Sequence, residues 1–133
     1  MTQEEKELLL KDLCARWPYG VKMSNINAIH NGLNLPPITV DVSDYENSNP
    51  LVLINSGFRP YLRSMSSMTE DEKVQLSQYA CIGEDLNGEF IDEVQREDCA
   101  KYIDWLNKKM FDYRGLIKKG LALEAPERMY YSV

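Results

Sequence analysis

The apolar residues of this chain change their spacing at the turn signal Pro18–Gly20, and that change limits what the chain can fold into. Before the turn, apolar side chains recur at helical spacing behind a capping-box pattern of Thr2 and Glu5, which predicts a helix at about Gln3–Arg16. Within Val21–Gly57, apolar and polar residues alternate instead, which is typical of half-buried strands. A helix followed by consecutive strands favours an α+β fold over alternating βαβ units.

The strand region predicts a small antiparallel sheet of residues 21–57, with a half-open barrel as the alternative. Asn31–Gly32 is a hairpin signal, and Leu51–Ile54 fits a strand that is covered on both faces. Pro36–Pro37 belongs at a strand entry or on an edge, because proline cannot donate to a central ladder. We expect the N-terminal helix and the C-terminal helices to pack on this sheet.

The C-terminal half carries two further helix signals. Thr69 and Glu72 form a second capping box, which opens a helix that continues through Ala80. A longer helix is expected at Ile91–Met110, where apolar residues again recur at helical spacing. With no long linker, we expect one globular domain spanning residues 1–133. The predicted core consists of Leu9, Leu13, Val21, Ile38, Val40, Val52, Ile54, Ile103 and Leu106.

Charge and hydropathy narrow the functional classes. A net charge of −6 argues against general binding of a phosphate backbone, which needs a basic surface. Residues 69–104 hold eleven acids and three bases, whereas residues 105–133 hold three acids and six bases. The acidic stretch is typical of solvated helix faces, or of a docking face for a basic partner. The acidic N-terminus does not resemble a signal peptide, and no aliphatic run approaches the roughly 20 residues of a membrane span. We therefore expect a cytoplasmic protein without membrane contact.

The residue inventory offers little support for metal or cofactor chemistry. His30 is the single histidine and adjoins a turn signal, so zinc sites with two imidazoles are excluded. Cys14, Cys81 and Cys99 show no CxxC spacing, and we expect three reduced, mostly buried thiols. We expect no catalytic residue, no cofactor and no bound metal.

Two irregular segments mix aromatic and basic residues. Tyrosine and arginine dominate binding hot spots, because they bury a large area and keep a polar group available. The two segments therefore form a candidate patch for a protein partner. The alternative is that Arg63 and Arg114 pair internally with carboxylates of residues 84–104 and support the fold. The five candidate positions, called here the aromatic–basic residues, are Arg59, Tyr61, Arg63, Tyr113 and Arg114.

Three blocks of sequence occur in a distinctive order and cover about half of the chain. The blocks are Lys11–Arg16 with Pro18–Lys22, Arg59–Arg63 with Met65–Glu70, and Asp104–Asn107 with Phe111–Ile117 and Lys119–Pro126. They resemble a family of small uncharacterised proteins of Bacteroides and their phages. The resemblance implies a prophage or mobile-element protein of a gut bacterium, and it brings no known activity with it.

Three classes of function remain open. We expect a non-catalytic protein-interaction or accessory module with a protein partner, and we leave its oligomeric state open. One alternative is a nucleic-acid-associated protein or a DNA mimic, which would use the basic C-terminal region or the acidic stretch. The other is a small enzyme that uses carboxylates such as Glu93 and Glu97, four residues apart on the expected helix.

Overall fold

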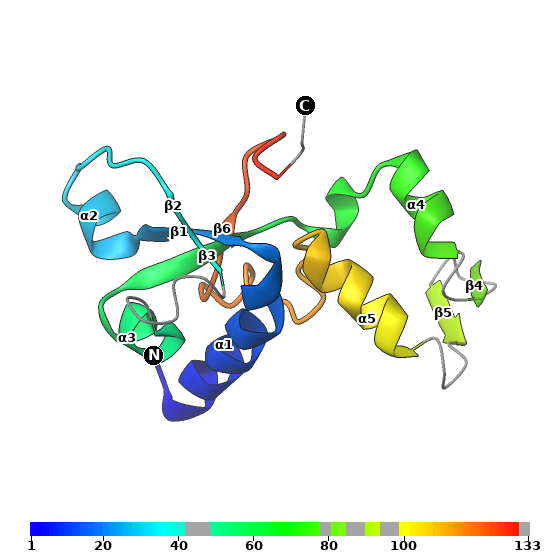
Figure 1. Cartoon of the computed structure of the whole chain (residues 1–133), viewed down its shortest axis with the longest axis horizontal. Helices are drawn as coiled ribbons and strands as arrows, with labels where there is room; N and C mark the ends of the chain where they lie inside the picture. Colours follow the sequence, from blue (N-terminus) through cyan, green and yellow to red (C-terminus); the bar gives the residue numbers. More distant parts are fainter. Residues whose placement is uncertain (42–48, 78–80, 85–89, 94–98, 131–133) are drawn as a thin grey trace.

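The chain forms a mixed sheet, a separate two-stranded hairpin and several short helices (Figure 1). The computed structural model describes residues 1–41, 49–77, 81–84, 90–93 and 99–130. Its helices are α1 (Gln3–Arg16), α2 (Ile26–His30), α3 (Pro50–Asn55), α4 (Glu70–Ser77) and α5 (Cys99–Lys108), with 3₁₀ turns η1 (Trp17–Tyr19) and η3 (Met65–Ser67). Its strands are β1 (Val21–Asn25), β2 (Ile38–Val40), β3 (Phe58–Leu62), β4 (Cys81–Glu84), β5 (Phe90–Glu93) and β6 (Leu123–Glu124). The α+β prediction is confirmed.

The main sheet has the strand order β2-β1-β3-β6. Strand β1 pairs antiparallel with both β2 and β3, whereas β6 runs parallel to β3. The expectation of a purely antiparallel sheet within residues 21–57 is therefore wrong, since β3 and β6 both lie beyond it. Pro60 is tolerated in β3 because β6 pairs only with Tyr61 and Leu62, which leaves position 60 with one neighbouring strand, β1.

Helix α1 matches its prediction in bounds and in capping. The Thr2 hydroxyl accepts a hydrogen bond from the Glu5 backbone N–H at 3.1 Å, and the Glu5 carboxylate accepts one from the Thr2 N–H at 2.9 Å. Leu9 and Leu13 are fully buried against the sheet. Cys14 is exposed, which corrects the expectation of a buried thiol at that position.

The strand expected at Leu51–Ile54 is wrong, because these residues belong to helix α3. The Asn49 side chain accepts the Leu51 N–H at 2.9 Å, and Pro50 occupies the first helical turn. A short aliphatic run does not by itself distinguish one helical turn from a buried strand. Asn31–Gly32 likewise ends α2 and does not form a two-residue hairpin turn between β1 and β2.

The long helix expected at Ile91–Met110 is also wrong in its first half. Phe90–Glu93 is strand β5, paired antiparallel with β4, and α5 begins only at Cys99. The second capping box is confirmed, since the Thr69 hydroxyl accepts the Glu72 N–H at 3.2 Å. The expected end of that helix at Tyr79 and Ala80 lies outside the described residues.

Two apolar clusters form the core. The larger one lies between α1, the sheet and the chain after α5, and comprises Leu9, Leu13, Trp17, Val21, Met23, Val40, Ile54, Leu62, Met110, Leu116, Leu121 and Ala122. The smaller one joins α4 to α5 and comprises Leu76, Trp105, Leu106 and Phe111.

Of the predicted core, Ile38 and Val52 are exposed, because β2 is an edge strand and Val52 faces away from the interior. Ile103 is only partly buried, and the other six predictions are confirmed. In Figure 1, α4, α5 and the β4–β5 hairpin extend to one side of α1, with α2 and α3 on the other.

Candidate functional site

The two aromatic–basic segments lie side by side, as the sequence suggested. Residues 59–62 belong to the extended strand β3, and Arg63 forms a parallel bridge to Phe111. The Arg63 N–H donates to the Met110 carbonyl at 2.7 Å, and the Asp112 N–H donates to the Arg63 carbonyl at 2.8 Å. These backbone bonds place the end of β3 against the chain that leaves α5.

Arg63 is committed to an internal ion pair with Glu72 of α4. Its two terminal nitrogens donate to the two carboxylate oxygens at 2.7 and 2.6 Å, a bidentate geometry that is both strong and specific. The guanidinium also lies 4.2 Å from the centre of the Phe111 ring. Burial opposes ionisation of Glu72, but hydrogen bonds from Arg63 and from the Thr69 backbone outweigh it and hold the Glu72 pKa below its usual value. This pair fastens α4 to the sheet.

Arg114 is committed to a second ion pair, on α1. The fully buried Asp12 accepts hydrogen bonds from Arg16 at 2.8 and 3.0 Å and from Arg114 at 3.0 Å. Both guanidiniums stack on Tyr113, at 5.3 and 4.9 Å from the ring centre. The Tyr113 hydroxyl donates to the Asn107 side chain at 2.9 Å, which connects this group to α5. The ion pairs therefore join α1 to the chain after α5.

Arg59 and Tyr61 also make internal contacts. One terminal nitrogen of Arg59 donates to the Ile54 carbonyl at 3.0 Å and to the Phe58 carbonyl at 2.7 Å, so this side chain caps the end of α3. Burial lowers the Arg59 pKa. The Tyr61 hydroxyl donates to the Ser24 hydroxyl at 3.0 Å and connects β3 to β1.

The geometry thus matches the internal-pairing alternative, with different partners. Arg63 pairs with Glu72 and Arg114 with Asp12, not with the carboxylates of residues 84–104 that the sequence predicted. All five aromatic–basic residues are buried or half-buried and hold elements together. Their participation in partner binding stays a prediction.

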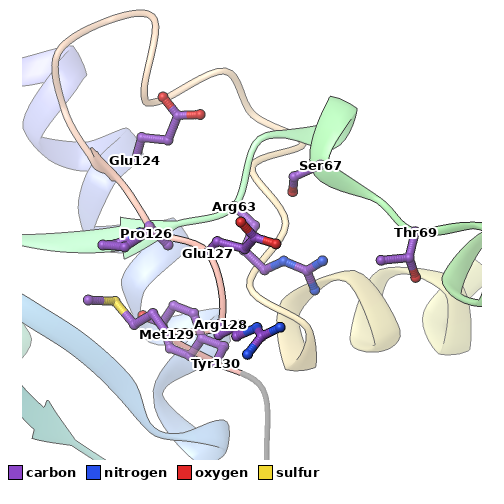
Figure 2. Close-up of a pocket in the computed structure, with 10 residues that line it drawn as sticks. Arg63, Ser67, Thr69, Glu124, Pro126, Glu127, Arg128, Met129 and Tyr130 are labelled. Carbon is purple, nitrogen blue, oxygen red and sulfur yellow. The ribbon is translucent and has the colours of Figure 1, made fainter.

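A pocket of about 400 Å³ opens beside Arg63, between η3 and the C-terminal segment (Figure 2). Arg128 lies at its wall with a φ of +70°, an uncommon backbone conformation for a residue other than glycine. Glu124 and Glu127 face the same space, and the charge of Arg63 is already balanced by Glu72. The lining therefore carries both signs of charge and does not select an anion or a cation. The lining contains three hydroxyl side chains, those of Ser67, Thr69 and Tyr130, and no histidine, so it offers no imidazole base.

A second, smaller recess of about 100 Å³ lies between α2, the start of β2 and the end of β1. Large apolar side chains line it and remain exposed to solvent: Ile29 by 46%, Leu33 by 55%, Leu35 by 63% and Ile38 by 38%. We call this recess and its four exposed side chains the apolar groove. The sequence did not predict this groove, because Ile38 was expected in the core, Asn31–Gly32 in a hairpin turn and Pro36–Pro37 at a strand entry or edge.

The wall of the apolar groove is held in place by backbone bonds. The Asn25 side-chain oxygen accepts the N–H groups of Asn27 and Ala28 at 2.9 and 3.3 Å, which caps α2. The Ile26 N–H donates to the Gly57 carbonyl at 2.9 Å. Gly57 has a φ of +97°, and a Cβ there would lie 2.6 Å from the Asn27 side-chain nitrogen, so only glycine fits. The groove is therefore formed before any partner arrives.

Within the described residues, the structure supports neither a metal site nor the proposed pair of carboxylates. Those residues contain no group of three or more histidine, cysteine or acidic side chains that could hold a metal ion. Glu93 lies on strand β5 and Glu97 falls outside the described residues, so the proposed helical spacing of these carboxylates is wrong for Glu93. Across the described ranges, none of the helices has the length and apolar character needed to cross a bilayer.

Comparison with known proteins adds no relative. No family model matches the chain, and no curated protein and no solved structure matches it significantly. The fold and the surface therefore define the chain only as an α+β protein with an exposed apolar groove.

Proposed function

We propose that this protein is a non-catalytic interaction module that binds a protein partner through the apolar groove. The observation that carries the proposal is the exposure of four large aliphatic side chains around one preformed recess. Scattered apolar residues are normal on a protein surface, but a contiguous group around a cavity marks an interaction site. The resemblance to Bacteroides and phage proteins supports a cytoplasmic role in a prophage or mobile element.

The aromatic–basic residues are the weaker candidate for the same role. Hot-spot residues contribute to binding when they are free to reach a partner, and these side chains already make internal hydrogen bonds and ion pairs. Using them for a partner would require giving up those contacts. Leu33 and Leu35 require no such exchange, because their side chains are already in solvent.

The test is capture of a partner from a Bacteroides lysate by the immobilised protein, compared across variants. We expect Leu33→Ser with Leu35→Ser to reduce capture at least tenfold while changing the free energy of unfolding by less than about 0.5 kcal/mol, as for other surface changes. Val74→Ser on α4 is the matched control, since Val74 is equally exposed at 63% and lies away from the groove. Capture that survives the double change, or that Val74→Ser reduces equally, contradicts the proposal.

A further inference from the structure

We infer that the pocket of about 400 Å³ beside Arg63 binds a small zwitterion, a molecule that joins one ammonium group and one carboxylate to an apolar body. An apolar amino acid and a dipeptide share this chemistry. We call the site the C-terminal pocket, because residues 124–130 form most of its lining. The inference concerns a second site and does not depend on the binding of a protein partner at the apolar groove.

The backbone at Arg128 is the first observation that supports a ligand. The Met129 N–H donates to the Pro126 carbonyl at 3.1 Å and closes a turn in which Arg128 has a φ of +70°. Glycine or asparagine is usual at this position of a turn, because other side chains are strained at a positive φ. Among the described residues, no hydrogen bond or ion pair of the Arg128 side chain offsets the strain. Uncompensated strain of this kind is typical of ligand-binding positions.

Glu127 supplies the opposite charge next to Arg128. Its side chain is exposed, and it forms no ion pair within the part of the chain that the structure describes. Figure 2 shows Glu127 and Arg128 extending from the C-terminal segment toward the side on which Thr69 lies. A guanidinium binds a carboxylate through two parallel hydrogen bonds, and a carboxylate accepts hydrogen bonds from an ammonium group. The two neighbours therefore match the two charged groups of a zwitterion.

The wall that carries these two residues is fixed at both ends. The Ala125 N–H donates to the Leu62 carbonyl at 2.8 Å, which attaches the segment to the end of β3. The Tyr130 hydroxyl donates to the Tyr61 carbonyl at 2.7 Å. The same hydroxyl accepts the Lys22 N–H at 3.0 Å, so it lies between β1 and β3. The pocket is therefore formed in the free protein, which reduces the entropy cost of binding.

The remaining lining favours a ligand with an apolar body. Apolar surface lies beside the charged groups and comes from Ala125, Pro126, Met129 and Tyr130. The volume of about 400 Å³ falls at the lower end of the range of roughly 300–1,000 Å³ for small-molecule sites. A simple anion would be repelled by Glu124 and Glu127, and a simple cation by Arg128, whereas a zwitterion meets a group of each sign.

Isothermal titration calorimetry of the intact protein tests this chemistry with phenylalanine, leucine and leucyl-leucine as probes. The matched controls are the N-acetyl and amide derivatives of the tightest probe, which lack the ammonium group and the carboxylate respectively. We expect at least one probe to bind with a Kd of about 1 mM or lower, and both derivatives to bind at least tenfold more weakly. Preference for the amino acids or for the dipeptide supports the inference equally and identifies the source. No binding of any probe at about 10 mM, or equal binding of either derivative, overturns the inference.

Two variants then connect binding to the strained turn. Glycine tolerates a φ of +70°, so we expect Arg128→Gly to keep or raise the melting temperature and to weaken binding of the probe at least tenfold. Glu127→Gln should weaken binding to a similar degree. Glu4→Gln, at an exposed side chain in the first turn of α1, should leave binding unchanged.

The same variants define the results that contradict the inference. If Arg128→Gly lowers the melting temperature by several degrees, then Arg128 supports the fold and the inference is overturned. Unchanged binding in either pocket variant overturns it too, as does an equal loss of binding in Glu4→Gln.

Discussion

Two regions of this molecule carry the large side chains that proteins use for binding, and the regions differ in what those side chains contact. Of the aromatic–basic residues, Arg63, Tyr113 and Arg114 lie where α1, the end of β3, α4 and the chain after α5 meet, whereas Arg59 and Tyr61 contact α3 and β1. Each of the five makes a hydrogen bond or ion pair within the chain. The apolar groove lies beside α2, at the start of β3 and away from Arg63, and its four aliphatic side chains remain in solvent.

The comparison separates residues that hold the fold from residues available to a partner. Burying an arginine is costly unless a partner compensates it, so Arg63 and Arg114 stabilise only the arrangement that supplies Glu72 and Asp12. An exposed leucine has no comparable internal purpose. We therefore expect changes in the first region to act on stability and changes in the second to act on binding.

The largest effect is expected at the Arg63–Glu72 pair. Arg63→Met leaves a buried carboxylate unpaired, and removing one partner of a buried pair costs about 3–5 kcal/mol. Urea unfolding measures the loss, and adding Glu72→Leu should restore part of it. If Arg63→Met keeps full stability but loses partner capture, then Arg63 acts in binding and not in holding the fold.

A slightly smaller effect is expected from truncating a core residue. Leu13→Ala should cost about 2–5 kcal/mol, because Leu13 is fully buried in the larger cluster. Val52→Ala is the matched change at a residue that is 59% exposed, and it should cost less than about 0.5 kcal/mol. Similar losses at both positions in thermal or urea unfolding would mean that burial does not separate the two regions.

The stability of the protein should depend on pH through the ionisation of Glu72. Its pKa in the folded protein lies below the usual value, so the unfolded chain takes up the proton first as the pH falls. The stabilising contribution is therefore complete above about pH 4.3 and declines as the pH falls through the lowered pKa of the folded state. We expect the stability difference between the wild type and Glu72→Gln to narrow below that pH. Glu70→Gln, at a side chain that is 90% exposed, is the control variant on the same helix.

The smallest effect is expected at Tyr61. Tyr61→Phe removes one hydrogen bond to Ser24 and keeps the ring, so the loss should be about 0.5–1.5 kcal/mol. Capture of a partner per folded molecule should not change. A large loss of capture with unchanged unfolding would return the aromatic–basic residues to the role of a binding surface.

Local signals predicted the parts of the fold that local chemistry determines. The two capping boxes at Thr2 and Thr69 were readable, because each is complete within four residues. The sequence also held a signal for the start of α3, since Asn49 followed by Pro50 is a typical helix start. The aliphatic run after it nevertheless suggested a strand, which was wrong.

The features that the sequence did not predict depend on contacts between residues far apart in the chain. Glu72 satisfies both its own helix and an arginine nine residues away, and only its capping role has a local signature. Asp12 and Arg114 are 102 residues apart, so no spacing rule connects them. The exposure of Leu33 and Leu35 depends on how α2 is capped and placed, and a turn-like composition gave no sign of an apolar surface there.

The most direct test of the central claim is hydrogen–deuterium exchange of the intact protein, free and bound to its captured partner. We expect the amides of residues 28–38 to exchange more slowly in the complex, while those of residues 59–63 and 111–114 keep the rates of the free protein. Slower exchange at residues 59–63 and 111–114, with no change at residues 28–38, would place the binding surface at the aromatic–basic residues and contradict the account.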